Sequence, residues 1–168
     1  MPKPTSDAGS TLYEPSFHIV LHQPEIPPNT GAIGRTCVAL QAKLWLVRPL
    51  GFRIDERTLR RAGLDYWQYL QWQVADDWEQ LQQEAGEGPR MWMFTKTASE
   101  DFQQARYQKG DWLVFGSETS GLPPSLLEQP DRNLRIPTFA NVRSLNLSSA
   151  VAVAGYEAAR QIDLFAGV

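Results

Sequence analysis

Short apolar runs recur along the chain, and each is bounded by polar or turn-forming residues. The runs that we expect to form strands are 17–22, 43–47, 91–95, 112–115 and 134–136. Most of them are continuously apolar rather than alternating, which is typical of strands buried on both faces of a sheet. The pattern therefore predicts an inner, mainly parallel sheet.

Apolar positions at helical spacing lie between and after these runs. One predicted helix has Asn29 or Thr30 as its cap and apolar positions at Ile33, Cys37, Val38 and Leu40. Weaker patterns predict short helices at about 56–62 and 76–84, and a largely buried helix closes the domain over 146–162. A strand, a helix and a second strand in that order imply a right-handed parallel crossover, so the fold class is α/β.

Size and composition indicate one folded domain. A length of 168 residues suits a single domain, which we place at 17–168 after a disordered leader at 1–16 rich in Pro, Ser and Thr. No apolar run is long enough to span a membrane. Cys37 is the only cysteine, so an intramolecular disulfide is impossible and a reducing compartment, the cytoplasm, is expected.

Charge leaves the question of nucleic-acid binding open. The net charge of −3 argues against a non-specific nucleic-acid coat, because Lys and Arg supply most of that affinity. Although the net charge is negative, several arginines form a local basic patch, and an aromatic cluster, Tyr66 to Tyr69, follows it. The patch is either an RNA contact or a solvated helix face. Its members are Arg48, Arg53, Arg57, Arg60 and Arg61.

The first candidate motif runs from Pro24 to Gly31 and continues to Arg35. A proline-stiffened loop leads into a helix whose free N–H groups favour an anion, and Arg35 lies about one turn into that helix. The pair suits a phosphate or another charged substrate group. Alternatively, Asn29 is only a helix cap and Arg35 a surface charge.

The second motif, Phe115 to Pro123, carries Gly116, Glu118 and Gly121. The glycine spacing matches the start of a phosphate-binding P-loop, but the Lys and Ser/Thr that must follow the second glycine are replaced by Leu122 and Pro123. A nucleoside triphosphate site is therefore disfavoured, as is a dinucleotide site, since no Gly-x-Gly-x-x-Gly occurs. A plain strand-to-helix turn is the alternative.

The third motif, Arg143-Ser-Leu-Asn-Leu-Ser-Ser149, leads into the helix that carries Tyr156 and Glu157. Hydroxyl and amide side chains at a helix start are usually caps, but this run holds more hydrogen-bonding capacity than one cap uses. Tyr156, about three turns along the helix, is either a core aromatic or a substrate contact.

In this order the motifs resemble those of the SPOUT superfamily of RNA 2′-O-methyltransferases. The resemblance covers about 17–162, and the absence of an added RNA-binding domain points to the single-domain TrmL-like (YibK-like) branch. The chain departs from the common pattern at Ala32 and Thr138, where relatives often carry Asn and Met. The matching residues are Asn29-Thr-Gly31 with Arg35, Gly116-x-Glu118-x-x-Gly121-Leu-Pro123, Ile136-Pro137, Arg143 to Ser148, and Tyr156-Glu157.

The resemblance implies more than the patterns do. It implies a SPOUT α/β-knot fold with a deep C-terminal trefoil knot at about 116–156, an obligate homodimer, and S-adenosylmethionine as methyl donor with no metal. The implied substrate is the ribose 2′-hydroxyl of the tRNA wobble nucleotide, a cytidine or modified uridine, with a leucine tRNA expected. The implied cofactor positions are Met93, Gly116, Ile136, Ser144, Leu145 and Asn146.

The resemblance also assigns roles to polar side chains. Arg35, Tyr156, Asn29 and Glu118 form the implied catalytic set, and Arg143, Arg60 and Arg61 the implied RNA contacts. An arginine stays protonated at neutral pH, so we expect Arg35 to bind phosphate or steady the developing alkoxide while another group or water accepts the proton.

Two other functions remain open on the sequence. One keeps the fold but moves the substrate to ribosomal RNA or another tRNA position, and the other is a non-catalytic RNA-binding module. His18 and His22 share a strand face, but without a supporting Cys or carboxylate partner we interpret them as structural rather than as metal ligands.

Overall fold

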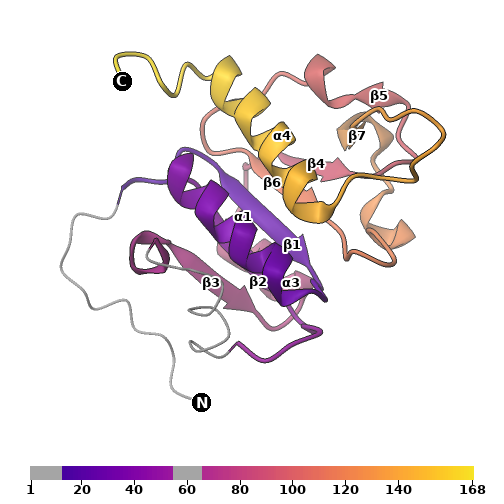
Figure 1. Ribbon diagram of the computed structural model, residues 1–168, viewed down its shortest axis with the longest axis horizontal. Helices are drawn as coiled ribbons and strands as arrows, with labels where there is room; N and C mark the ends of the chain where they lie inside the picture. Colours follow the sequence, from indigo (N-terminus) through magenta and orange to yellow (C-terminus); the bar gives the residue numbers. More distant parts are fainter. Residues whose placement is uncertain (1–12, 55–65) are drawn as a thin grey trace.

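The fold is built on a seven-stranded, wholly parallel sheet (Figure 1). We describe it from a computed structural model, which places residues 13–54 and 66–168. The strand order is β3-β2-β1-β6-β4-β7-β5. The strands are β1 (His18–His22), β2 (Lys43–Val47), β3 (Trp72–Ala75), β4 (Met91–Phe94), β5 (Glu100–Asp101), β6 (Trp112–Phe115) and β7 (Asn133–Arg135).

Helices cover both faces of the sheet. The helices α1 and α4 lie side by side on one face in Figure 1, and α3 packs against the other. The 3-10 helices η1 to η4 occupy connections. The bounds are α1 (Pro27–Ala39), α3 (Trp78–Ala85), α4 (Leu147–Gln161), η1 (Trp67–Tyr69), η2 (Phe102–Gln104), η3 (Pro124–Leu126) and η4 (Pro130–Arg132).

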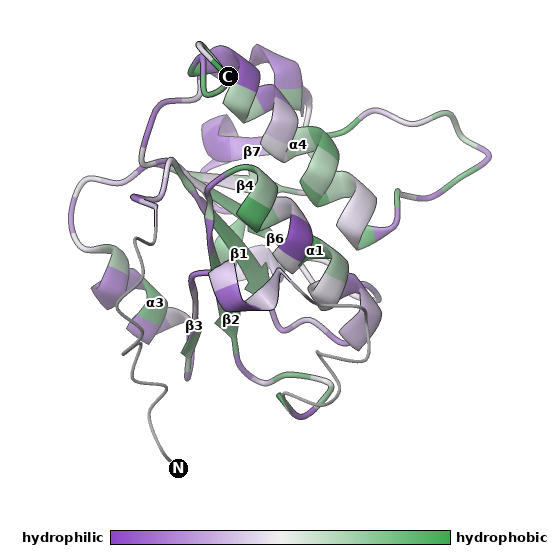
Figure 2. Ribbon diagram, turned by 60° about the vertical axis from the view of Figure 1, so that its left-hand side comes forward, coloured by the Kyte–Doolittle hydropathy of each residue, from purple (hydrophilic) through white to green (hydrophobic). Residues whose placement is uncertain are grey.

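The central strands are apolar because the sheet is buried on both sides. In β1, Ile19 and Leu21 enter the core under α1 and α4, whereas Val20 enters the core under α3. All three are fully buried, and Figure 2 shows the inner strands as the most hydrophobic part of the ribbon. This arrangement explains why the strands show apolar runs rather than alternation.

The two helices on the first face approach each other closely. A Cβ built on Gly155 of α4 would lie 2.7 Å from Cδ1 of Leu40, which directly follows α1. Any larger residue at Gly155 must therefore displace the buried Leu40 side chain.

Most predicted elements are confirmed. The 43–47 and 112–115 strands have the expected bounds, and the strand predicted at 134–136 begins one residue earlier, at Asn133. The last helix runs from Leu147 to Gln161 with Asn146 as its cap, close to prediction. The helix predicted at 76–84 is α3.

The predicted start of the first helix is wrong. The helix α1 begins at Pro27, its cap position is Ile26, and no side chain bonds to its first turn from that position. Asn29 and Thr30 therefore lie inside the helix. Proline at the first helical positions lacks the N–H that would need a partner there, and so it starts the helix earlier than the polar residues suggested.

Two strands were missed, and some predictions fall outside the described residues. The strands β3 and β5 were not predicted, because β3 mixes polar and apolar residues and β5 has only two residues. The helix predicted at 56–62 lies outside the described residues, as do residues 1–12 of the predicted leader. The described end of the predicted leader, residues 13–16, packs on the domain. The Tyr13 hydroxyl donates to Ala42 O, and Ser16 Oγ donates to Leu40 O. None of the described helices is long and apolar enough to cross a membrane.

Candidate active site

The segments that carry the three sequence motifs leave the sheet at one edge. In a parallel sheet all strands point the same way, so the segments that follow β1, β6, β4 and β7 leave from a common edge. This edge is where open α/β sheets bind ligands, above all where strand order reverses. Here the chain passes from β1 outward to β2, while β6 and β4 lie on the other side of β1.

Glu118 connects the first motif to the second. Its carboxylate accepts hydrogen bonds from the backbone N–H groups of Glu25 (2.8 Å) and Ile26 (3.1 Å) and from the Asn29 side-chain amide (3.3 Å). These donors stand at the entrance of α1, where no local side chain caps the helix. A carboxylate from a segment 90 residues away thus takes the place of a helix cap.

Asn29 is buried and oriented by this contact. It is 7% exposed, lies in the first turn of α1, and donates its amide to Glu118. The hypothesis that Asn29 is merely a helix cap is therefore wrong. Asn29 and Glu118 form one polar junction.

The loop of residues 116–121, which carries Glu118, folds back tightly on itself. Gly121 N donates to Ser117 O at 3.0 Å, and Gly121 has a φ of +66°. A Cβ on Gly116 would lie only 2.1 Å from the Gly121 carbonyl carbon. Gly116 is therefore required by the crossing backbone, and the loop has a fixed, narrow shape.

Three of the implied cofactor positions lie on neighbouring strands. Met93 belongs to β4 and pairs with Val114 of β6 and Asn133 of β7. Gly116 directly follows β6, and Ile136 directly follows β7. Gly116 and Ile136 therefore follow two strands that flank β4, and Met93 lies one residue before the end of β4 between them.

The other implied cofactor positions stand at the start of α4. Asn146 caps that helix, since its Oδ1 accepts from Ser148 N (2.9 Å) and Ser148 Oγ (2.6 Å). Ser144 is exposed, and Leu145 is 37% exposed. The loop before Asn146 thus presents main-chain groups and one apolar side chain to the outside rather than to the core.

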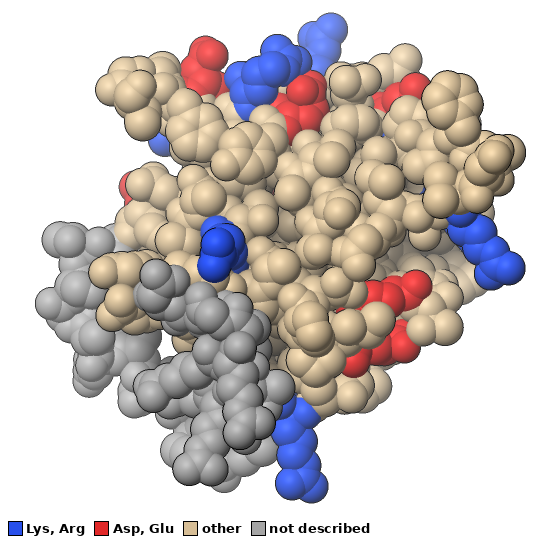
Figure 3. Space-filling model, in the orientation of Figure 1, with Lys and Arg blue, Asp and Glu red and all other residues tan. Residues whose placement is uncertain are grey.

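Of the arginines with an implied role toward RNA, Arg35 of the catalytic set and Arg143 lie in the described part of the chain. The Arg35 guanidinium lies 5.0 Å from the centre of the Tyr66 ring, and Arg143 is exposed in the loop before α4. Arg60 and Arg61 lie outside the described residues. In Figure 3 the described Lys and Arg side chains are scattered over the visible face rather than gathered into one broad patch.

Tyr156 does not join the polar junction within this chain. It is half exposed and stacks on Phe165 with ring centres 6.0 Å apart. Nine residues separate it from the start of α4, about 14 Å along the helix axis. The sequence hypothesis that Tyr156 is a core aromatic is wrong, because its ring lies at the surface.

A surface cavity with a volume of about 540 Å³ adjoins the 116–121 loop. It opens between that loop, the end of β1 and the segment after β2, and includes His22, Glu25 and Ser120. Burial lowers the pKa of His22, so its imidazole is neutral at pH 7. Hydrogen bonds from the Thr119 hydroxyl and then Ser117 lower the pKa of Glu25, so its carboxylate is charged there.

The histidines have structural surroundings. His18 Nδ1 accepts a hydrogen bond from Trp45 Nε1 at 3.0 Å, and its ring stacks on Trp112. Among the residues that the structure describes, no three His, Cys, Asp or Glu side chains are grouped as metal ligands would be.

Glu25 was not selected from the sequence as a site residue, and Tyr66 was noted only as part of the aromatic cluster after the basic patch. Glu25 contacts Thr119, and the Tyr66 hydroxyl donates to Gly31 O while its ring faces Arg35. The acidic residue next to a helix start was a usable signal, because negative charge is favourable there. The contact between Tyr66 and α1 has no local sequence signal.

Comparisons with known proteins agree on one family. The model of the SpoU rRNA Methylase family matches residues 16–156. A tRNA (cytidine(34)-2′-O)-methyltransferase of Burkholderia pseudomallei is 46% identical over 154 residues, covering 90% of this chain and 99% of the relative.

Solved structures give the same result. One described as giving structural insights into the 2-OH methylation of C/U34 on tRNA is 43% identical, with a TM-score of 0.82, and the match covers 86% of this chain and 95% of that one. An AdoMet-bound rRNA methyltransferase from Sinorhizobium meliloti is 25% identical, with a TM-score of 0.78 over 89% of this chain and 57% of that one.

Proposed function

The chain belongs to the SpoU rRNA methylase family, and from this premise we propose that it is a tRNA 2′-O-methyltransferase. It transfers a methyl group from S-adenosylmethionine to the ribose 2′-hydroxyl of nucleotide 34, a cytidine or modified uridine. The observation that carries the proposal is the junction of Glu118, Asn29 and the α1 entrance beside the ends of β6, β4 and β7. Relatives of nearly the same length that carry this name support the choice of substrate.

The residues at this edge suit S-adenosylmethionine. The segment from Ile136 to Leu145 is mostly exposed, Ile136 packs on the core, and Leu145 offers apolar surface. Main-chain N–H and C=O groups beside apolar side chains can bind an adenine without a charged partner. The bound sulfonium supplies the methyl group. Met93, Gly116, Ile136, Ser144, Leu145 and Asn146 would hold it, and an AdoMet-bound relative supports this cofactor.

Side chains that bind RNA must orient the ribose hydroxyl for methyl transfer. A ribose hydroxyl must be held in line with the methyl group, and such positioning is a large part of the rate enhancement. Arg35 is exposed on α1 and keeps its charge at neutral pH, so it binds a phosphate or steadies the developing oxyanion. Arg143 contacts the RNA backbone, and Tyr156 contacts the nucleotide or the edge of the cofactor.

The active unit is a homodimer in this proposal, and the 116–156 segment is knotted. Exposed apolar side chains on α4 and after it support an interface there: Val153 is 40% exposed, Tyr156 50% and Phe165 43%. Such a surface is typical of a subunit contact. A partner placed on α4 would also bring Tyr156 out of solvent and toward a substrate. A tRNA substrate further implies the cytoplasm.

Purified protein, S-adenosylmethionine and tRNA transcripts test the proposal. We expect one 2′-O-methyl group at nucleotide 34, located by mass spectrometry of nuclease fragments, and none when that nucleotide is 2′-deoxy. Methylation of ribosomal RNA or of another tRNA position would keep the enzyme class but refute the substrate. RNA binding without methylation of any RNA would refute the enzyme.

A further inference from the structure

A second carboxylate at the junction has no role in the proposed function so far. Glu118 reaches from the 116–121 loop to the entrance of α1, and Glu25 reaches back in the opposite direction. The Thr119 hydroxyl donates to Glu25 Oε2 at 2.7 Å, while the Glu25 backbone N–H donates to Glu118 at 2.8 Å. Each of the two segments thus supplies a carboxylate that accepts a hydrogen bond from the other.

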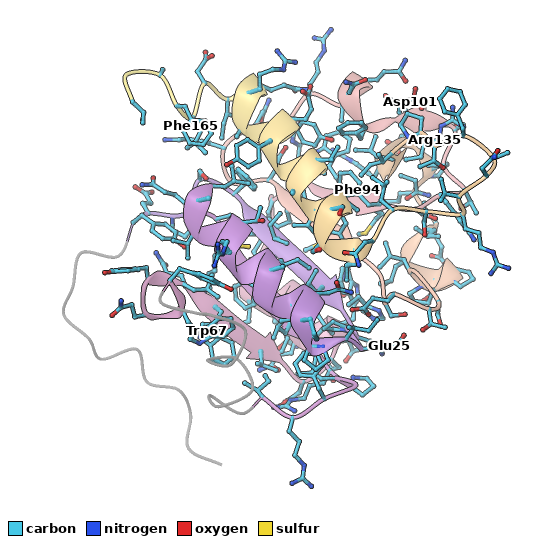
Figure 4. All side chains as sticks on the ribbon, viewed as in Figure 1. Glu25, Trp67, Phe94, Asp101, Arg135 and Phe165 are labelled. Atoms are coloured by element: carbon cyan, nitrogen blue, oxygen red, sulfur yellow. The ribbon has the colours of Figure 1, made fainter. Side chains whose placement is uncertain are left out.

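The backbone of Glu25 is held on its other side as well. Gly51 N donates to Pro24 O at 2.9 Å, and a Cβ on Gly51 would lie 2.7 Å from Glu25 Cα. The segment after β2 therefore packs directly against this residue. Figure 4 shows Glu25 at the N-terminal end of α1, where these segments meet. Its side chain extends from a point that is fixed on both sides.

We propose that Glu25 is a positioning residue for cofactor binding. Its carboxylate, through the Thr119 hydroxyl, holds the 116–121 loop in the shape that binds S-adenosylmethionine at Gly116. This inference rests on the proposed function. It adds a role for two residues, Glu25 and Thr119, that neither the motifs nor the comparisons assign.

The contact is better suited to positioning than to stability. Thr119 is exposed and Glu25 is only partly buried, and exposed polar contacts contribute little to the free energy of unfolding. The 116–121 loop, in contrast, borders the proposed cofactor site through Gly116, where a small displacement weakens binding. Loss of the contact therefore affects affinity for the cofactor more than the fold.

Two removals and two conservative variants test the proposal. Glu25→Ala and Thr119→Val each remove the contact, while Glu25→Gln and Thr119→Ser keep an acceptor and a hydroxyl. We expect Glu25→Ala to raise the KM for S-adenosylmethionine and the Kd for S-adenosylhomocysteine about fivefold, the value of a charge-assisted hydrogen bond reduced by exposure. Thr119→Val should raise both by less, because Ser117 and the Thr119 backbone N–H still bond to the Glu25 carboxylate. The value of kcat and the melting temperature should change little, and the conservative variants should restore most of the affinity.

The double variant tests whether Glu25 and Thr119 affect cofactor binding through the same contact. Glu25→Ala with Thr119→Val should weaken binding no more than Glu25→Ala alone, because Glu25→Ala already removes the contact with the Thr119 hydroxyl. Glu14→Ala, an exposed carboxylate on another segment, is the control and should bind like the original chain.

Additive effects, unchanged cofactor affinity, or a loss that follows the melting temperature would overturn the positioning role and leave the proposed function intact. An original chain that binds no S-adenosylhomocysteine and methylates no RNA would instead refute the proposed function, and this inference with it.

Discussion

At the scale of single residues, the site depends on one carboxylate that satisfies three donors. The sequence indicated that Asn29 and Glu118 belong together only through a family resemblance. Their spacing of 89 positions carries no local signal, and only the parallel pairing of β1 with β6 brings them into contact. The helix cap was mispredicted for the same reason, since the true acceptor comes from a distant loop.

Glu118→Ala should both destabilise the domain and impair methylation. The change leaves the Glu25 and Ile26 N–H groups and the Asn29 amide without their acceptor. Partly buried donors without partners cost about 2 kcal/mol in the free energy of unfolding. Urea titration measures this loss, and Glu128→Ala, an exposed carboxylate elsewhere, should change it by less than about 0.5 kcal/mol. An unchanged unfolding midpoint in Glu118→Ala would contradict the role of this junction.

At the scale of elements, the inner strands and the last helix were predictable because burial acts on every residue in them. The run at 43–47 is apolar throughout its core-facing positions and emerged with the expected bounds. The strand β3 was not predicted because its sequence, Trp72-Gln-Val-Ala75, mixes polar and apolar residues. Its position in the sheet comes from pairing with β2. Local propensity cannot supply that information.

The close approach of α4 to α1 makes Gly155 sensitive to substitution. Gly155→Val should lower the free energy of unfolding by about 2 kcal/mol, because the added side chain must displace Leu40 or separate the two helices. Thermal unfolding followed by circular dichroism measures the effect. Arg160→Ala on the same helix removes an ion pair with Glu157 in which the Arg160 side chain is 70% exposed, and it should lower the melting temperature by less. Equal melting temperatures for the two variants would show that the helix contact is not tight.

At the scale of the whole molecule, the sequence predicted an α/β domain with a parallel sheet, and the structure confirms it. The convergence of Met93, Gly116 and Ile136 at one edge follows from the strand order, which no local pattern contains. The knot, the dimer and the contacts of Arg60 and Arg61 stay predictions.

The dimer can be tested through the exposed face of α4. Val153→Asp places a charge in the proposed interface, where a desolvated carboxylate is unfavourable. We expect a folded monomer with greatly reduced methylation, measured by light scattering after size exclusion and by methyl transfer to tRNA. Val168→Asp makes the same substitution at a fully exposed position and should leave a dimer. If Val153→Asp remains dimeric, the interface lies elsewhere.

Stability should fall as the solution is acidified through the range of histidine titration. Burial, and then the charge of Lys43, lowers the pKa of His18 to about 4 in the folded protein, whereas an unfolded histidine titrates near about 6.5. Between these pH values His18 is protonated in the unfolded chain but not in the folded chain. The free energy of unfolding therefore decreases as pH falls. Above pH 6.5 the contribution of His18 is complete. His22 acts in the same direction.

Urea unfolding at pH 7.5, 6 and 5 measures this slope. His18→Gln, which stays neutral over the range, should show a smaller decrease than the original chain. Equal slopes would mean that the imidazole of His18 titrates normally in the folded protein.

The strand order also bears on how this chain reaches its native state. The centre of the sheet pairs β1 with β6, and His18 faces Trp112, a residue 94 positions later. During synthesis β1 and β2 leave the ribosome before β6, because the neighbour on the other side of β1 lies 94 positions further along the chain. Closing so long a loop is slow, and an unsatisfied apolar edge invites aggregation in the meantime. From this topology we expect folding to be limited by the long-range pairing of β1 with β6.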